Sequence, residues 1–416
     1  MPRVYRLLTH EYFLYAIVLA MSIGVYYARA AVSIATVTFG VIAIMTVVQK
    51  DKWPELKLSK SVFALTAIFL VILLSGLVSS NTEMWLKRLD HNMPFLALPV
   101  GLWAFSRANN KVAVNSILIF IAITALSSLA VMVDYLLNME EYNALYKVGK
   151  TIPTPIIHVR YSYFLAVACI SCIGLLLDKS LSIARHKTWV TILCVWLALC
   201  VHVLAVRTGI FALYGGIMTL AAALVIREKR WKLGLAAFGA IAGVFILSIL
   251  LLPSVGNKIK YVMHDLKMLR VEGFSPEYSD NIRIVSIQNG LQLFSENPIF
   301  GVGAGDIEDE MNLLYAEQAP DMAPESRYPP ISQYVYWLAT FGIVGTIAIM
   351  TLLFFPLFRH WRSSYFLIAI YALTFFSFMA ETTIQLQLGK TVFILLACLG
   401  AIEAVRRTTS PVGSRQ

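Results

Sequence analysis

Long apolar stretches follow one another along nearly the whole chain, and short polar segments separate them. Twelve of these stretches are close to the length that an α-helix needs to cross the hydrocarbon core of a bilayer. The pattern therefore predicts an all-α polytopic membrane protein with about twelve transmembrane helices. The stretches lie at 12–29, 31–48, 62–80, 92–106, 112–134, 162–178, 188–206, 209–226, 232–253, 333–357, 363–381 and 390–405.

The fourth stretch, 92–106, is short and contains Pro94 and Pro99. Proline has no backbone N–H and kinks or ends a helix. We therefore expect this stretch to be broken or re-entrant, and the sequence leaves open whether it crosses the membrane fully.

One polar segment, 254–332, is much longer than the other connections. It divides the chain into helices 1–9 (1–253), a loop (254–332), and helices 10–12 with a short tail (333–416). Long loops often carry function. An amphipathic stretch from Ile284 to Phe294 indicates that this loop is partly helical.

The composition agrees with a membrane protein, because 58% of the residues are hydrophobic and only 14% are charged. A soluble domain has about 25% charged residues.

The net charge of +10 could serve to bind nucleic acid or could reflect membrane topology. The distribution of the charges along the chain decides between the two. With the N-terminus inside, the inner segments hold 20 of the 34 Lys and Arg but six of the 24 Asp and Glu. This asymmetry is the positive-inside pattern, so both termini are expected in the cytoplasm, the loop outside, and the partners to include membrane lipids but no nucleic acid.

Cysteine and histidine give no sign of a metal or redox site. Cys169 and Cys172 have the spacing of a CxxC motif, but they lie in the middle of an apolar stretch without acidic or histidine neighbours. We read them as small helix residues. His91, His158 and His264 lack metal-ligand spacing, and His202 is expected to be a hydrogen-bonded core residue. No metal and no cofactor are therefore predicted.

Ionisable residues gather where the stretches meet the outer surface, and such residues are candidates for function because charges are costly in a membrane. They are His158, Arg160, Arg207 and Glu381, the last followed by Lys390, and a further candidate, Arg283, lies in the long loop. Arginine suits phosphate, since its planar guanidinium donates two parallel hydrogen bonds and keeps its charge. The alternative for each arginine is that it reaches the lipid headgroups or pairs with an acid. Arg207 has the least freedom to do so, because its turn is very short.

The loop also contains a glycine-rich segment, Asn297-Pro-Ile-Phe-Gly301-Val-Gly303-Ala-Gly305-Asp306. It is not a dinucleotide-binding fingerprint, because Asp306 stands where a third glycine is required. A plain turn is one interpretation. The other is that the glycines allow the backbone to approach another group closely.

These segments together resemble the O-antigen ligase and polymerase superfamily, whose members are membrane glycosyltransferases that use glycans linked to a polyprenyl pyrophosphate. The resemblance covers most of the chain and includes the twelve stretches and the long loop after the ninth. It also rests on short motifs, namely Arg207-Thr-Gly209, Asn281-Ile-Arg283, the glycine-rich segment, Ser332-Gln333-Tyr334 followed by Gly342-Ile-Val-Gly345, and Glu381 with Gln387-Leu-Gly389.

The resemblance implies an inverting, metal-independent transfer of a glycan from undecaprenyl pyrophosphate to an acceptor hydroxyl, on the periplasmic face of the bacterial inner membrane. It implies that Arg207, Arg160 and Arg283 bind the pyrophosphate, and that Glu381 or His158 takes the proton. The remaining implied residues form a loop and acceptor-side motif, namely Gly301, Gly303, Asp306, Gln333 and Tyr334. The acceptor is lipid A–core in a ligase and a second lipid-linked glycan in a polymerase.

The chain departs from the ligase pattern at Ile331, because ligases of this family have a histidine eleven residues before the position of Gly342. Ligase and polymerase therefore both stay open, as does a non-catalytic scaffold. The alternative from another class is a solute transporter or lipid flippase. Such proteins place ionisable residues near the middle of the membrane, where this sequence has very few, so an enzyme is favoured.

Overall fold

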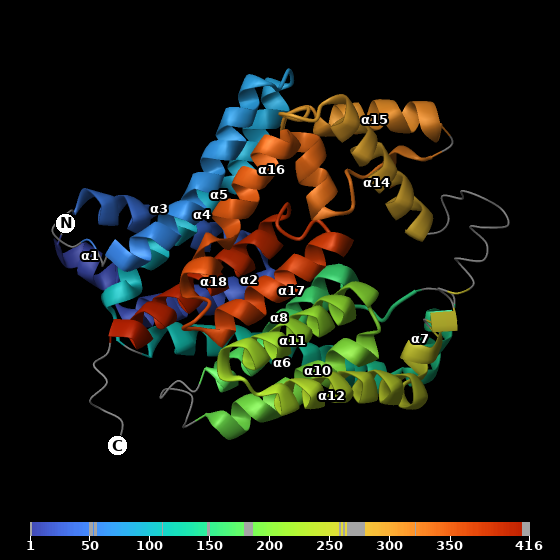
Figure 1. Ribbon diagram of the computed structural model, residues 1–416, viewed down its shortest axis with the longest axis horizontal. Helices are drawn as coiled ribbons and strands as arrows, with labels where there is room; N and C mark the ends of the chain where they lie inside the picture. Colours follow the sequence, from blue (N-terminus) through green and yellow to red (C-terminus); the bar gives the residue numbers. More distant parts are fainter. Residues whose placement is uncertain are drawn as a thin grey trace.

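The computed structural model describes residues 2–49, 53, 56–109, 111–147, 150–178, 186–257, 259–260, 263, 279–320 and 322–409. These residues form helices and connecting turns, without a β-strand among them (Figure 1). His264 and the predicted loop residues 264–278 lie outside the described residues. The helices are α1 (Pro2–Leu8), α2 (Glu11–Tyr27), α3 (Arg29–Val48), α4 (Leu56–Leu74), α5 (Thr82–Trp103), α6 (Val112–Leu137), α7 (Met139–Lys147), α8 (His158–Leu177), α10 (Lys187–Leu204), α11 (Arg207–Glu228), α12 (Trp231–Leu251), α14 (Ser279–Glu296), α15 (Ile307–Gln318), α16 (Gln333–His360), α17 (Tyr365–Ala380) and α18 (Gln387–Thr409), with 3₁₀ turns at Ser75–Leu77, Ala104–Arg107 and Pro324–Ser326.

Each of the twelve predicted apolar stretches coincides with one of these helices. Among the described residues, nine helices are long and apolar enough to cross a membrane, and α2 and α17 are shorter apolar helices. The all-α class and a multi-pass membrane protein are therefore confirmed. The twelfth stretch belongs to α5.

Helix α5 differs from the prediction for the stretch 92–106. It is one helix of 22 residues that begins ten residues earlier, at Thr82, and contains both Pro94 and Pro99. At 1.5 Å per residue its length is about 33 Å, similar to the other helices. Its first half carries charged residues, which is why hydropathy alone placed its start too late.

Helix α18 runs through the centre of the bundle, and its apolar stretch within Gln387–Arg407 is completely buried. It contacts α4, α5, α6, α16 and α17. Helices α8, α10, α11 and α17 pack together beside it, and α12 packs on α11 with most of its side chains exposed (Figure 1). The exposed apolar side chains of α12 are those expected of a helix that faces lipid.

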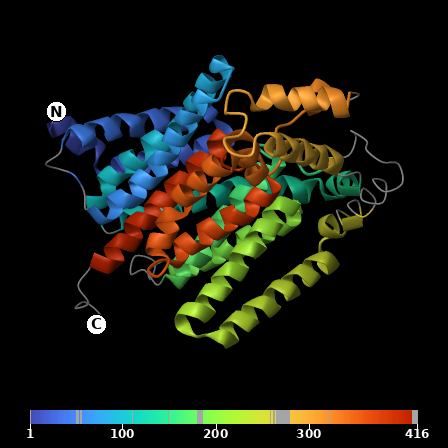
Figure 2. The same ribbon diagram turned by 45° about the horizontal axis from the view of Figure 1, so that its top comes forward.

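Helices α14 and α15 lie across one end of the bundle, which we call the loop face (Figure 2). The start of α1 and the end of α18 lie away from it, at the left of Figure 1.

The glycine-rich segment is inserted into a kink of α16. Gly342 interrupts this helix with φ 61° and ψ −169°, a conformation that favours glycine. A Cβ on Gly342 would lie 2.3 Å from the Ile299 carbonyl oxygen. The backbone groups released by the kink bond to the loop instead, from Val302 N to Ala339 O (2.9 Å), Gly303 N to Thr340 O (2.9 Å), Ile343 N to Pro298 O (2.9 Å) and Val344 N to Ile299 O (3.3 Å).

The end of the same segment binds the turn between α4 and α5. The Asp306 carboxylate accepts hydrogen bonds of 2.7 Å from the backbone N–H groups of both Ser80 and Asn81. Gly303 and Gly305 allow the loop to lie against Ser79, since a Cβ on Gly303 would be 2.3 Å from the Ser79 hydroxyl oxygen. The glycines thus allow a close backbone approach, and the group they approach is the protein itself.

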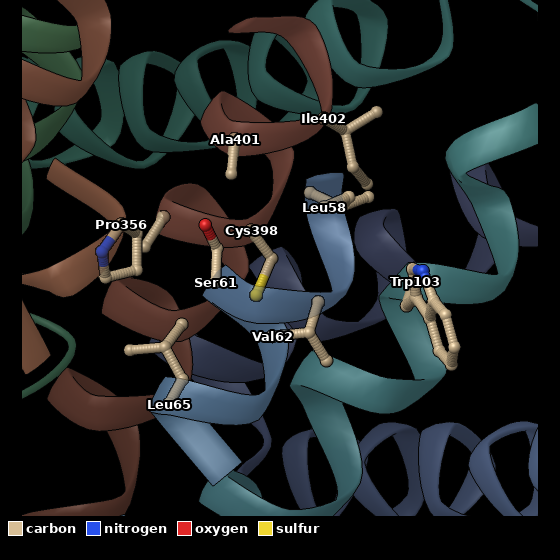
Figure 3. Close-up of a pocket in the computed structure, with 10 residues that line it drawn as sticks. Leu58, Ser61, Val62, Leu65, Trp103, Pro356, Cys398, Ala401 and Ile402 are labelled. Carbon is tan, nitrogen blue, oxygen red and sulfur yellow. The ribbon is translucent and has the colours of Figure 1, made fainter. Parts of the chain in front are cut away.

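A small apolar cavity lies at the other end of the bundle, between α4, α5, α16 and α18 (Figure 3). Its volume is about 10 Å³. Ser61, which lines it, lies 3.3 Å from the ring nitrogen Nε2 of His360 within hydrogen-bonding distance. With this size and lining, the cavity is a packing gap.

Candidate functional site

The site at the loop face begins with the packing of α11 on α8. Gly209 sits in the first turn of α11, and a Cβ at this position would lie 1.9 Å from the hydroxyl oxygen of Ser162 on α8. A side chain larger than hydrogen would therefore push the two helices apart. The glycine of the motif Arg207-Thr-Gly209 brings the start of α11 beside the start of α8, which carries His158 and Arg160.

The turn before Arg207 consists of two residues. Ala205 adopts a left-handed conformation with φ 51° and ψ 33° at the end of α10, and α11 begins after Val206. The hydroxyl of buried Tyr146 on α7 donates to the carbonyls of Val203 and Leu204, at 3.1 and 3.2 Å. Helix α7 therefore supplies a hydrogen-bond donor to carbonyls at the end of α10 that have no partner within their own helix.

Arg160 and Glu381 line the same cavity, which we call the Arg160–Glu381 cavity. They are close enough for their opposite charges to attract each other. The cavity volume is about 20 Å³, room for about one water molecule, so a larger ligand would require the surrounding segments to move. The lining residues are Val159, Arg160, Tyr163, Phe164, Thr208, Glu381, Thr383, Leu386 and Gly389.

Glu381 occupies the first position after α17, where the chain becomes extended. Its carboxylate accepts a hydrogen bond of 3.2 Å from the backbone N–H of Thr382. Gly389 permits the following turn, because a Cβ there would lie 2.0 Å from the Thr383 carbonyl oxygen. The connection between α17 and α18 is therefore tightly folded, and it holds Glu381 at the cavity.

Arg283 on α14 reaches the same place from the loop. Its guanidinium donates to the carbonyl of Ala380, the residue before Glu381. One turn further along α14, the Ser286 hydroxyl accepts a hydrogen bond of 3.2 Å from the N–H of Ile331. The structure thus brings the predicted residues Arg160, Arg283 and Glu381 together. Ile331, the position at which the chain differs from the ligase pattern, lies nearby.

Arg207 faces another cavity, which we call the Arg207 groove. Arg207 is exposed at the start of α11, while its neighbour Thr208 lines the Arg160–Glu381 cavity. The groove has a volume of about 350 Å³. Its other lining residues come from the end of α10, from α11, from α12 and from the segment after α12. They are mostly apolar, namely Ala205, Ile210, Phe211, Tyr214, Phe245, Val255, Ile259 and Met263.

His202 is a hydrogen-bonded core residue, as predicted. It is 5% exposed, and its two ring nitrogens lie 2.7 Å from the Ala198 carbonyl and 2.7 Å from the Tyr214 hydroxyl.

His158 begins α8 and is half-buried. It is not among the residues that line the Arg160–Glu381 cavity.

Gln333 and Tyr334 hold the end of α17 in place. The Gln333 side chain is fully buried and accepts hydrogen bonds from the N–H groups of Ile384 (3.0 Å) and Gln385 (3.2 Å). The Tyr334 hydroxyl donates to the Phe375 carbonyl at 2.9 Å. Both residues of the predicted acceptor-side motif therefore contact α17 or the connection that carries Glu381.

Two arginines were missed in the sequence. Arg29, at the start of α3, lies close enough to Arg160 for their positive charges to repel each other. Its position at the end of the first apolar stretch was the available signal. Arg88 lies inside α5 and was hidden because the start of that helix was predicted too late.

Residues 192–350 match the Wzy_C family, which is described as O-antigen ligase. The matched segment runs from α10 into α16 and includes Arg207, Arg283 and the glycine-rich segment. The resemblance predicted from the motifs is confirmed over this segment. A comparison with curated proteins gave no match.

Proposed function

Because residues 192–350 of this multi-pass membrane protein carry an O-antigen ligase domain, which implies glycosyltransferase activity, we propose an O-antigen ligase-like transfer. A glycan moves from undecaprenyl pyrophosphate to an acceptor hydroxyl on the periplasmic face. The observation that carries this proposal is the meeting of Arg160 and Glu381 in one cavity beside Thr208, at the start of the helix that carries Arg207.

The donor binds with its pyrophosphate at the start of α11 and its polyprenyl chain in the Arg207 groove. The apolar lining of the groove suits an isoprenoid, and the guanidinium of Arg207 lies among these apolar residues. Arginine donates two parallel hydrogen bonds to phosphate. Arg160 lines the neighbouring cavity with Thr208, and Arg283 reaches the residue before Glu381, so the proposal assigns both to the phosphates together with Arg207.

The chemistry is an attack of the acceptor hydroxyl on the anomeric carbon, with inversion and departure of undecaprenyl pyrophosphate. The arginines stabilise the negative charge that develops on the departing group, and they do so without a metal ion. Glu381 accepts the proton of the hydroxyl, since it is the carboxylate that lines the cavity with Arg160. His158, at the start of the same helix as Arg160, is the second candidate for this role.

Polymerisation of lipid-linked glycans is the second candidate function, and Ile331 favours it. The structure places this position beside α14, where its N–H binds Ser286. Isoleucine cannot take a proton, so the transfer does not use a base here. A polymerase would use a second lipid-linked glycan as acceptor in place of lipid A–core.

The test is the glycan profile of a deletion strain complemented with the parental gene or with an Arg160→Ala variant. Long chains that accumulate on the carrier lipid indicate a ligase, and accumulated single repeats indicate a polymerase. We expect the parental gene to restore the profile and Arg160→Ala to fail at equal protein level. An unchanged glycan profile in the deletion strain would contradict both functions. It would leave a solute transporter or lipid flippase as the alternative function.

A further inference from the structure

A second cavity, lined mostly by apolar residues but also by four polar ones, adjoins the connection between α17 and α18. We call it the Arg88 cavity. Its polar lining residues come from three segments, and its volume is about 20 Å³. Gln385 of the connection lines this cavity, whereas Glu381 and Thr383 of the same connection line the Arg160–Glu381 cavity. The polar residues of the lining are Arg88, Asn92, Tyr336 and Gln385.

The polar groups of this cavity are organised by hydrogen bonds. The Tyr336 hydroxyl accepts a hydrogen bond of 2.8 Å from the Gln385 side-chain amide. The Asn92 amide donates to the Arg88 carbonyl at 2.8 Å, one turn earlier on α5. Tyr336 is 1% exposed and Asn92 is 5% exposed. Such buried groups have fixed positions, as a binding site requires.

Two basic side chains are buried here. The side chain of Arg88 is 13% exposed and pairs with Glu308 on α15, and its Nε has no hydrogen-bond partner among the described residues. Lys390 on α18 is fully buried. Its ammonium donates to the His91 carbonyl at 2.8 Å and to the side-chain oxygen of Asn92.

Lys390 is not paired with a carboxylate in the described part of the chain, where the ion pairs involve other residues. A buried charge without a counter-charge is strongly unfavourable. Glu308 balances the charge of Arg88, whereas Lys390 donates to neutral oxygens and avoids an uncompensated buried charge by releasing its proton. An anion that enters the cavity would favour the protonated form of Lys390 and bind the open Nε of Arg88.

We propose that the Arg88 cavity is a second anion-binding site, which holds a carboxylate or phosphate group of the acceptor sugar. The proposal rests on the proposed transferase function, because a transferase needs two substrates next to one reacting centre. The connection that carries Glu381 separates the two cavities, so an acceptor anchored at Arg88 lies beside the proton acceptor. The cavity has room for about one water molecule, so the surrounding segments must move to admit the oxygens of an anionic substituent, while the sugar ring remains outside.

The test is ligand-induced stabilisation of the purified full-length protein in detergent, without donor. The probes are glucuronate and glucose 6-phosphate, with glucose as the neutral control. A ligand that binds the folded state raises the unfolding temperature. We expect both anionic sugars to raise it and glucose to leave it unchanged. No rise with the anionic sugars, or an equal rise with glucose, would overturn the proposal.

Three variants locate the effect. Lys390→Met should raise the apparent dissociation constant of the anionic sugars at least about tenfold, because a hydrogen bond or charge contact to an anion is lost. Glu308→Gln removes the negative charge that pairs with Arg88, so binding should be unchanged or tighter. Arg160→Ala alters the donor cavity and should retain the stabilisation.

Equal binding by Lys390→Met and the parent would overturn the site, as would loss of binding in Arg160→Ala with retention in Lys390→Met. If Lys390→Met does not fold, Tyr336→Phe replaces it with the same expectation of weaker binding, and parental affinity in that variant is the contrary result. The readout needs no transfer, so failure of this site is distinguishable from failure of the proposed function.

Discussion

Glu381 shows how a single residue acquires a role from its position at a helix end. Helix α17 ends at Ala380, and the extended backbone of Glu381 directs the chain back toward α18. The cations around it come from elements far apart in the sequence, since Arg160 begins α8 and Arg283 lies on α14. A carboxylate beside arginines can accept a proton or form an ion pair, and these roles respond differently to substitution.

Glu381→Gln separates the two roles, because glutamine keeps the shape and the hydrogen-bonding capacity but cannot accept the proton. We expect a well-expressed protein with glycan transfer reduced at least about 10²-fold, the usual cost of losing a general base. Transfer per molecule is measured in the complemented deletion strain. Glu325→Gln, at an exposed acid of the loop, is the control and should transfer at the parental rate. Parental transfer by Glu381→Gln would remove this residue from the mechanism.

Arg207→Lys tests whether position 207 requires a guanidinium or only a positive charge. Lysine cannot donate two parallel hydrogen bonds to phosphate, so we expect both Arg207→Ala and Arg207→Lys to abolish transfer at normal expression. Arg327→Lys is the matched control, because the Nε of Arg327 donates to the Met322 carbonyl within the loop. Full transfer by Arg207→Lys would identify Arg207 as an ordinary surface charge.

At the scale of elements, the long loop and α16 form one interlocked unit. The kink at Gly342 releases backbone groups, and the glycine-rich segment binds them with four hydrogen bonds. Asp306 then attaches the segment to the turn between α4 and α5. The loop is therefore attached both to α16 and to the turn between α4 and α5, at the face where Arg283 meets the end of α17.

Gly342→Ala should destabilise the protein by at least about 2 kcal/mol, because alanine disfavours the positive φ and its Cβ would collide with Ile299. A lower unfolding temperature in detergent and a lower yield would report this. The control is Gly239→Ala in α12, where a Cβ meets nothing within 4 Å and alanine favours the helix. Equal stability of the two variants would argue against the interlocked loop.

At the scale of the whole molecule, the charge asymmetry of the sequence and the position of the loop predict one orientation. The loop face carries α14 and α15, and both ends of the described chain lie away from it (Figure 1). The proposed transfer requires the loop face to be periplasmic, because the lipid-linked donor is used there.

Cysteine labelling of intact cells tests this orientation. A cysteine at position 300, where Phe300 is 60% exposed, should react with an impermeant maleimide. A cysteine at position 228, at the end of α11, should react only after permeabilisation. The native cysteines are buried or half-buried, so their background should be low. Protection of position 300 in intact cells would contradict the orientation and the proposed reaction.

The sequence by itself determined the fold class and the approximate position of every long helix. The reason is that the transfer of an apolar stretch into lipid depends on local composition and length. The one large error, the start of α5 at Thr82, arose where charged residues such as Arg88 lie inside a helix. Burial of those charges depends on partners such as Glu308, which are distant in the sequence.

Only the tertiary structure decided which candidate residues meet. The packing of Gly209 on Ser162 brings α11 beside α8, and Gly389 at the start of α18 lets the connection that begins at Glu381 pack closely against this helix. Arg160 and Glu381 therefore share a cavity, while Arg207 lines a separate groove. Helix contacts of this kind depend on close approach at small residues from separate segments, and this information is not contained in the hydropathy of any single segment.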